Sequence, residues 1–317
     1  MQPSCGHRAA KKTTMRAFVP ARDAQRLVEF DEVEEPLAGE GDVVVEVEAF
    51  SVNRGDLYQI GDAQPGWRPG QDVAGTVLTT TAEWPSVGTR VAGLPLWGGW
   101  AERVALPATR VAALPDDLST RKAAALPLAA TTALGLLRAA GPLFGCRVLA
   151  TGAAGGLGHF LVQMAANAGA EVTAVTSSAE RGERLLNLGA AEVVREVEEA
   201  QGPFEVVFES VGGVTLPAAV QATAPGGLVL WYGQASLEPS SFDLRALIPC
   251  ADVRVQVFNY YHSAAFRDTD LATVVRLVAE GRLHIEVGRE EPWERTPEIL
   301  ADLRDRRIVG NAVLTVT

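Results

Sequence analysis

A glycine-rich turn between an apolar run and a helical pattern constrains the fold of this chain more than any other feature. Val148-Leu149-Ala150-Thr151 leads into Gly152-Ala153-Ala154-Gly155-Gly156-Leu157-Gly158, and apolar residues at helical spacing follow at once. Glycine permits a tight turn and a close approach of backbone N–H groups to a ligand, and the helix N-terminus stabilises phosphate charge. The turn therefore predicts a pyrophosphate site; a glycine-rich turn that binds nothing is the alternative. The residues expected to hold the pyrophosphate are Gly152, Ala153, Gly155, Gly156, Leu157 and Gly158.

Strand and helix patterns alternate around this turn. Strands are expected over residues 147–151, 171–176, 192–195, 203–208 and 228–232, with helices over 156–168 and 179–188 between them. Strands that alternate with helices of about ten residues form a parallel sheet with right-handed crossovers. The sequence therefore predicts an α/β fold with a doubly wound parallel sheet, which is the context that a dinucleotide-binding turn requires.

The end of the second strand indicates which dinucleotide is bound. A site that prefers NAD places Asp or Glu about 20 residues after the glycines to hold the ribose 2′-hydroxyl. Here the strand ends in Ser177 and Ser178, with Arg181 within the next turn. These residues leave room for a 2′-phosphate and supply donors and a cation for it, which favours NADPH over NADH. A structural interpretation also holds, because Ser177 and Glu180 have the spacing of a capping box.

The segments on either side have a different character. Residues 15 to about 115 have the pattern of short strands and predict a mainly β domain, with a short helix near 56–60. Helices are expected over 269–279 and 297–306, and a final strand over 312–316 is expected to rejoin the first domain. The apolar run 123–137 is shorter than the ~18 residues of a membrane span, so we expect a buried helix. Residues 1–14 are expected to be a disordered extension.

Composition excludes several classes of function. The chain of 317 residues carries a formal net charge of −11, which repels phosphate backbones and anionic lipid surfaces, so no nucleic-acid or membrane partner is expected. The 3 cysteines are spread along the chain and form no disulfide framework, and no Cys or His pair has the spacing of a structural zinc site. No apolar stretch follows the basic N-terminus, so we expect no secretory signal and a cytoplasmic location.

Six short segments carry a family resemblance. They are Asn53-Arg54-Gly55-Asp56, Pro69-Gly70-Gln71-Asp72-Val73-Ala74-Gly75, Gly98-Gly99-Trp100-Ala101-Glu102, Ala125-Leu126-Pro127-Leu128-Ala129 with Thr132-Ala133, Gly226-Gly227 to Gly233, and Gly310 to Val313. With these segments in this order, the chain resembles the medium-chain dehydrogenase/reductase superfamily and, within it, the zinc-free quinone oxidoreductase branch. The resemblance covers the chain from about Met15 to Val316.

The resemblance implies a domain organisation and a set of site residues. It implies a GroES-like β-barrel catalytic domain from 15–118 plus 258–317, a Rossmann NADP-binding domain from 119–257, and commonly a homodimer. Asn53, Tyr58 and Thr132 would lie near the nicotinamide, and Gly233 would line its pocket. The same comparison places the adenosine phosphate at Ser177, Ser178 and Arg181.

The resemblance also bears on metal chemistry and on the acceptor. Zinc relatives have a Cys near Asn53 and Gly-His-Glu where this chain has Gly70-Gln71-Asp72, so no metal is expected. Without zinc, hydride transfer from NADPH to a quinone or an α,β-unsaturated carbonyl is favoured, because these acceptors delocalise charge onto their own oxygens. Tyr58 is the predicted proton donor and Asn53 an orienting amide. Alternatively, Tyr58 is a packing residue whose hydroxyl is satisfied locally.

Other residues of the site depart from the family pattern or have a simpler interpretation. Asp56 is expected to be a turn or cap residue, and His159 a partly exposed helix residue rather than a phosphate ligand. The stretch 61–64 lacks the Gly-x-Tyr of many relatives, and Asn311 replaces the usual Lys after glycine. Two alternative functions therefore stay open: an enoyl-thioester reductase, for which the chain shows no obvious basic rim, and a non-catalytic NADPH-binding module that senses redox state.

Overall fold

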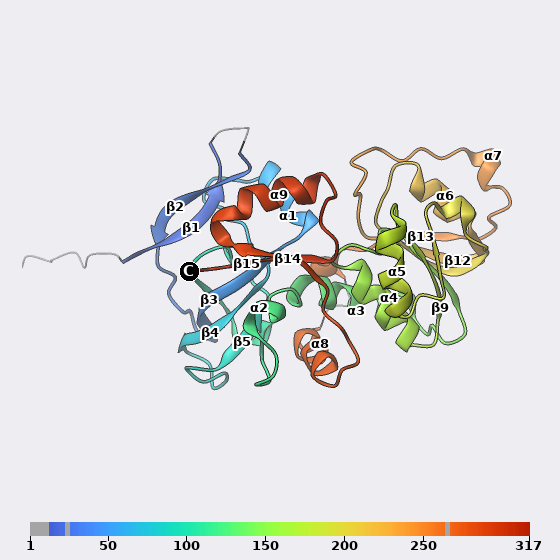
Figure 1. Ribbon diagram of the computed structural model, residues 1–317. Helices are drawn as coiled ribbons and strands as arrows, with labels where there is room; N and C mark the ends of the chain where they lie inside the picture. Colours follow the sequence, from blue (N-terminus) through green and yellow to red (C-terminus); the bar gives the residue numbers. More distant parts are fainter. Residues whose placement is uncertain (1–12, 23–25, 264–266) are drawn as a thin grey trace, which may run out of the picture.

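The computed structural model describes residues 13–22, 26–263 and 267–317, which form two lobes side by side (Figure 1). Most of the predicted N-terminal extension, residues 1–12, lies outside the described residues. Its last residue, Thr14, is in a strand instead, because β1 (Thr14–Pro20) pairs antiparallel with β2 (Val28–Glu34) along its whole length.

Within the described residues, one lobe is built on six parallel strands in the order β10-β9-β8-β11-β12-β13. This order reverses direction between β8 and β11, the type of switch point at which open α/β sheets bind ligands. The strands expected from the sequence are confirmed, and β13 is an additional edge strand. The bounds are β8 (Arg147–Ala150), β9 (Glu171–Val175), β10 (Glu192–Val194), β11 (Phe204–Glu209), β12 (Thr223–Trp231) and β13 (Arg254–Val257).

Helices cover both faces of this sheet. Successive residues of a strand point to opposite faces, so Val148 packs in the cluster that contains α3 and α4, while Leu149 packs in the cluster that contains α6. The predicted buried helix is confirmed from Pro127 onward, because this proline is the first residue of α3 and thus occupies a position that proline tolerates. The helices of this lobe are α3 (Pro127–Ala140), α4 (Gly158–Asn167), α5 (Ala179–Asn187), α6 (Thr215–Gln221) and α7 (Leu244–Leu247), whereas α2 (Thr120–Ala123) packs against the sheet of the other lobe.

The other lobe contains, in the part of the chain that is described, a sheet of seven strands around Trp100 and Trp293, which are fully buried. Strand β15 pairs antiparallel with β3, which confirms that the final strand rejoins the first domain. The remaining elements are β3 (Asp42–Val52), α1 (Arg54–Gly61), β4 (Val73–Thr80), β5 (Arg90–Gly93), β6 (Arg103–Pro107), β7 (Val111–Ala113), α8 (Asp270–Ala279), β14 (Val287–Pro292), α9 (Thr296–Arg304) and β15 (Asn311–Thr315).

The chain thus leaves the first lobe after β7, builds the parallel sheet and returns through α8, β14 and α9 (Figure 1). This arrangement confirms the predicted combination of a mainly β domain with a doubly wound parallel sheet. The exact boundaries, 15–118 plus 258–317 and 119–257, stay predictions. Among the described residues, no helix is both long and apolar enough to cross a membrane.

Candidate active site and cofactor-binding loop

The glycine-rich turn lies directly after β8, at the switch point of the sheet. Gly152 has a φ of +61°, a backbone conformation that favours glycine, and a Cβ added to it would collide with the Ser210 hydroxyl. A Cβ on Gly158 would lie 2.5 Å from the carbonyl oxygen of Ala153. A side chain at either position would therefore push the turn away from β8 and prevent α4 from packing closely against the sheet.

The loop forms a cradle that suits a pyrophosphate. Within the described residues, the N–H groups of Gly156 and Leu157 donate to no protein acceptor, and they precede the positive end of α4. Backbone donors at a helix N-terminus are the usual protein ligands of phosphate oxygens. The residues predicted from the sequence to hold the pyrophosphate are thus brought together in a geometry that fits this group.

A buried polar network fixes the base of the cradle. The Thr151 hydroxyl donates to a carboxylate oxygen of Glu209 over 3.2 Å and accepts from the N–H of Ser210 over 2.9 Å. Burial raises the pKa of Glu209, and hydrogen bonds from two backbone N–H groups and the Thr151 hydroxyl oppose this rise. Sequence reasoning missed Glu209 and Ser210, although an acidic residue at the end of an apolar strand was a detectable signal.

The other lobe contacts the cradle directly. The N–H of Gly310 donates to the carbonyl oxygen of Ala154 over 3.0 Å, and Gly310 forms a parallel bridge with Gly155. Gly156 packs so closely against the Asn311 amide that a Cβ would collide with its oxygen. Asn311, which replaces the family's lysine, is therefore a packing residue of the loop, and its N–H donates to the Glu286 carbonyl over 2.9 Å.

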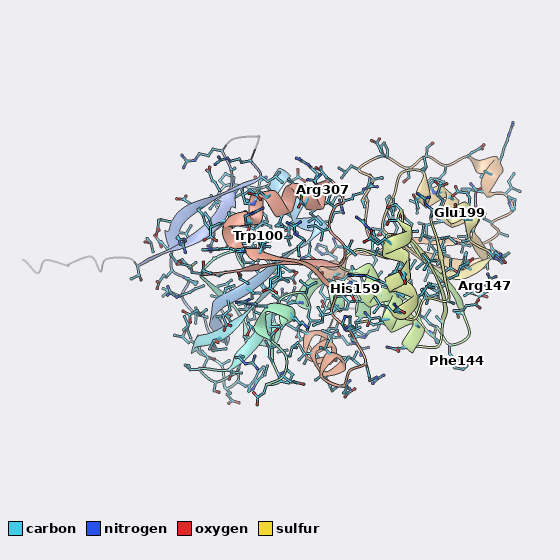
Figure 2. The ribbon with its side chains drawn as sticks, viewed as in Figure 1. Trp100, Phe144, Arg147, His159, Glu199 and Arg307 are labelled. Carbon is cyan, nitrogen blue, oxygen red and sulfur yellow. The ribbon has the colours of Figure 1, made fainter. Side chains whose placement is uncertain are left out.

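His159 joins the same two segments, at the junction between the lobes (Figure 2). Its Nδ1 lies 3.2 Å from the Gly155 carbonyl oxygen, and its Nε2 accepts from the N–H of Glu286 over 3.3 Å. These partners require the neutral tautomer with the proton on Nδ1. Burial lowers the pKa of His159 to about 4, and the side chain is only 2% exposed. The expectation of a partly exposed residue is wrong, because the second lobe covers this turn of α4.

The predicted 2′-phosphate residues lie at the tip of β9. Ser177 is exposed, Ser178 is half-buried, and the Arg181 guanidinium donates to the Arg306 carbonyl over 2.8 Å. The predicted capping box is wrong, because Ser178 rather than Ser177 is the N-cap of α5 and its side chain makes no capping hydrogen bond. Arg306, which the sequence analysis missed, donates to the Ala235 carbonyl over 2.7 Å and thereby joins the lobes beside these serines.

Asn53 immediately precedes α1 and Tyr58 lies on it, and this helix faces the parallel-sheet lobe. The Tyr58 hydroxyl donates to the Gln234 carbonyl over 2.7 Å, one residue after Gly233. The backbone at Gly233 lies so close to the end of β11 that an added Cβ would be 2.9 Å from the Ser210 carbonyl oxygen. The structure therefore brings Tyr58 to the segment that contains Gly233, while Thr132 is buried on α3.

A buried carboxylate holds the Asn53 amide. Asp72 accepts from Asn53 Nδ2 over 2.5 Å, from the Ser51 hydroxyl over 2.6 Å and from the N–H of Leu128 over 2.5 Å. Burial raises the pKa of Asp72 to about 6, against the effect of these three donors. Asp72 therefore connects the start of α1 to the N-terminus of α3, which contains Thr132.

Asp56 is a second buried carboxyl group beside this network. One of its oxygens accepts from the N–H of Asn53 over 2.6 Å, and the other has no hydrogen-bond partner in the described part of the chain. Burial, with the nearby Asp72 adding to the effect, raises the pKa of Asp56 to about 8. The expectation of a cap residue agrees with its bond to Asn53. In the ranges that the structure describes, no three His, Cys, Asp or Glu side chains are grouped so that they could hold a metal ion.

Comparisons with known proteins agree with this arrangement. Residues 39–116 match the family "Alcohol dehydrogenase GroES-like domain", and residues 156–280 match the family "Zinc-binding dehydrogenase". Among solved structures, a mycobacterial protein complexed with NADPH is 26% identical with a TM-score of 0.86, over 95% of this chain and 99% of that chain. A quinone oxidoreductase of Pseudomonas syringae is 28% identical with a TM-score of 0.84, over 96% of this chain and 100% of that chain.

Two curated proteins are also similar to this chain. The acrylyl-CoA reductase of Ruegeria pomeroyi is 33% identical over 223 residues, which cover 62% of this chain and 66% of that protein. A mycocerosic acid synthase-like polyketide synthase of Mycolicibacterium smegmatis is 28% identical over 88% of this chain, but the chain spans only 14% of that protein's length. With a GroES-like sheet and a dinucleotide-binding sheet joined across the glycine loop, the chain belongs to the medium-chain dehydrogenase/reductase superfamily.

Proposed function

We propose that this protein is an NADPH-dependent, zinc-independent reductase of quinones or α,β-unsaturated carbonyl compounds. The observation that carries the proposal is the glycine cradle at the switch point, with two serines and Arg181 rather than a carboxylate at the end of β9. The mycobacterial NADPH complex and the quinone oxidoreductase of Pseudomonas syringae support the same cofactor and acceptor class.

The residues of the parallel-sheet lobe bind the cofactor. The N–H groups of Gly156 and Leu157 hold the pyrophosphate, and Ser177, Ser178 and Arg181 hold the 2′-phosphate. Gly233 and Thr132 lie at the nicotinamide in this proposal. When bound, the dihydronicotinamide supplies the hydride, and the protein supplies position, donors and exclusion of water.

Residues on and next to α1 act on the acceptor. Asp72 holds the Asn53 amide in one orientation, so that this amide can position the acceptor's carbonyl group. Tyr58 is 42% exposed and its hydroxyl donates to a main-chain carbonyl, so the hydroxyl can turn toward a bound acceptor. The hydride adds to the β-carbon of an enone, the electron pair moves to the carbonyl oxygen, and the Tyr58 hydroxyl donates a proton to that oxygen. The resulting enol tautomerises to the saturated ketone, and water returns a proton to Tyr58.

The donor set at the acceptor side supports zinc independence. Zinc sites in proteins use thiolate, imidazole and carboxylate ligands. Asn53 and Gln71 supply only amides, and the oxygens of Asp72 already accept three hydrogen bonds. The proposed chemistry therefore uses hydrogen-bond donors rather than a Lewis acid.

An enoyl-thioester reductase is the second candidate, because the acrylyl-CoA reductase relative and the polyketide synthase relative both bear names of acyl-thioester chemistry. Both candidates transfer a hydride to an activated alkene, and they differ in the group attached to its carbonyl carbon. Activity with crotonyl-CoA but with neither quinones nor simple enones would favour this second candidate.

We also propose that the protein is a homodimer that pairs through β13. All residues of this strand are exposed, and it is an edge of the parallel sheet. Val257 is 71% exposed, and Leu244 and Ile248 nearby are also exposed. An apolar, unpaired edge favours pairing with another strand, and a second copy offers the same edge about a two-fold axis.

The test of the proposed reaction is oxidation of NADPH and NADH by purified protein with an ortho-quinone, a para-quinone and a simple enone. Turnover with NADPH well above NADH is expected with at least one acceptor. Tight NADPH binding without turnover of any acceptor, crotonyl-CoA included, would replace the proposal with a non-catalytic, redox-sensing NADPH-binding module.

A further inference from the structure

Arg68 lies in the turn between α1 and β4, against the segment that precedes β6. Its carbonyl oxygen accepts from the N–H of Gly98 over 2.9 Å, and the carbonyl of Gly70 accepts from Gly99 over 3.0 Å. A Cβ built on Gly98 would lie 3.4 Å from Arg68 Nη2 and 3.7 Å from its Cζ. The guanidinium group therefore lies alongside the backbone of Gly98, a glycine with a φ of +82°.

Among the residues that the structure describes, this guanidinium group has no hydrogen-bond or ion-pair partner. The side chain is half-buried, its Nη1 is fully buried without a hydrogen-bond acceptor, and no carboxylate forms an ion pair with it within the described residues. By contrast, the half-buried Arg90 donates to the carbonyls of Leu118 and Pro115 over 2.9 and 2.8 Å. A desolvated cation without a counter-charge destabilises a fold, and burial lowers the pKa of Arg68 accordingly. An anion that binds here would remove that cost.

The surroundings connect this cation to the acceptor site. Gln71, three residues further along, donates from Nε2 to the Leu96 carbonyl over 3.3 Å, and its neighbour Asp72 holds the Asn53 amide. Leu96 and Trp97, beside Gly98, are each 49% exposed. A cation next to two exposed apolar side chains forms a surface that fits a flat apolar body with one anionic end.

We infer that Arg68 binds a carboxylate of the acceptor, and that the substrate is an enone acid or quinone acid with a flat apolar body. Arginine suits this role because its guanidinium group can meet a carboxylate with two parallel N–H donors, here Nε and Nη2, since Nη1 is buried. The inference rests on the proposed reductase function and adds the substrate class. In the reaction, NADPH and one proton reduce the carbon–carbon double bond of an enone acid to a single bond, or a quinone acid to its hydroquinone. NADP⁺ is released, and the carboxylate itself is unchanged.

The experiment uses an acceptor pair that differs in one charge, 4-oxo-4-phenylbut-2-enoate and its methyl ester. We would measure kcat/KM by NADPH oxidation for the wild type, Arg68→Gln, Arg68→Lys and the control Arg195→Gln, which removes one charge at an exposed position after β10. In Arg68→Gln the ratio of acid to ester is expected to fall roughly 10- to 100-fold, mainly through KM, as for a lost charge-assisted hydrogen bond. Arg68→Lys should regain part of this ratio, and Arg195→Gln should leave it unchanged.

A binding measurement separates failure of this inference from failure of the proposed function. The saturated product, 4-oxo-4-phenylbutanoate, with NADP⁺ present should raise the Tm of the wild type and not that of Arg68→Gln. If the wild type reduces neither this acceptor pair nor the two quinones, the reductase proposal fails, and the Tm difference still decides the role of Arg68. An unchanged acid-to-ester ratio in Arg68→Gln, or an equal Tm rise in both proteins, would overturn the inference.

Discussion

The Tyr58 hydroxyl donates a hydrogen bond to the Gln234 carbonyl oxygen over 2.7 Å, and this bond joins α1 of one lobe to the segment after β12 of the other. A proton donor and a clamp between lobes predict different kinetics for Tyr58→Phe. We expect kcat with an enone to fall about 100-fold, the scale of a lost general acid, while the Kd for NADPH is unchanged. A raised Kd with an unchanged kcat would show that Tyr58 acts only as a clamp.

Cofactor choice should depend on the tip of β9. A carboxylate in Ser177→Asp would repel a 2′-phosphate and accept a hydrogen bond from a 2′-hydroxyl. We expect the ratio of kcat/KM for NADPH to that for NADH to fall at least roughly tenfold, the effect of one charged contact. Ser177→Ala is the matched control and should change the ratio much less. An unchanged ratio in Ser177→Asp would place the 2′-phosphate elsewhere.

His159 should govern NADPH affinity although its ring is buried behind the loop. His159→Leu removes the donor to Gly155 and the acceptor for Glu286, so the cradle loses its link to the other lobe. We expect the Kd for NADPH, measured by fluorescence titration, to rise roughly tenfold, the scale of one hydrogen bond. His159→Asn restores a donor near Nδ1 and should recover part of the affinity. Equal affinity in all three proteins would contradict this role.

Asp56 should make the fold less stable as the pH rises. Its pKa in the folded protein is raised from 3.8 to about 8, so the folded state holds a proton that the unfolded chain releases. Its stabilising contribution is present below pH 3.8 and is lost as the pH rises through about 8. Asp56→Asn cannot ionise and still offers an oxygen to Asn53. In thermal unfolding between pH 4 and 9, the Tm of Asp56→Asn should increase relative to that of the wild type as the pH rises.

The control for this titration is Asp62→Asn, at an exposed position just after α1. It shows how far the loss of an exposed carboxyl group by itself changes the Tm at each pH. If the Tm difference of Asp56→Asn varies with pH no more than that of this control, Asp56 is ionised in the folded protein at neutral pH.

The oligomeric state should depend on β13. Lysines at Val255 and Val257 would place like charges on both copies of the paired edge, so the double variant should sediment as a monomer where the wild type sediments as a dimer. Phe144→Lys, at an exposed position before β8, is the control and should leave the dimer intact. A monomeric wild type would contradict the proposed pairing.

The sequence predicted what local patterns determine. The glycine turn, the alternation of strands and helices and the final strand all follow from spacing and residue type, and the structure confirms them. The sequence did not predict the roles of residues that depend on contacts between distant segments. His159 was expected to be partly exposed because nothing near it in the sequence shows that residues 284–286 cover it. Arg306 and Ser210 join the site from loops whose position only the assembled sheets define.

The roles of residues at or near the departures from the family pattern also could not be predicted from the sequence. The sequence shows only that Asn311 replaces the usual Lys, whereas in the structure its amide packs against Gly156 and donates to the Glu286 carbonyl. The role of Asp72 depends on Leu128 and Ser51, which approach it from different elements. Side-chain roles that require three segments to meet are beyond what spacing in one segment can predict.

The bridge between Gly155 and Gly310 has a consequence for the protein's synthesis. The parallel sheet and its glycine loop leave the ribosome long before β15, and domains fold in the order in which they are made. Until β15 arrives, the loop has neither the bond from Gly310 nor the packing of Asn311. A nascent chain can therefore complete most of its parallel sheet while its cofactor loop is still unbraced, and tight binding of the nucleotide marks a chain whose last strand is in place.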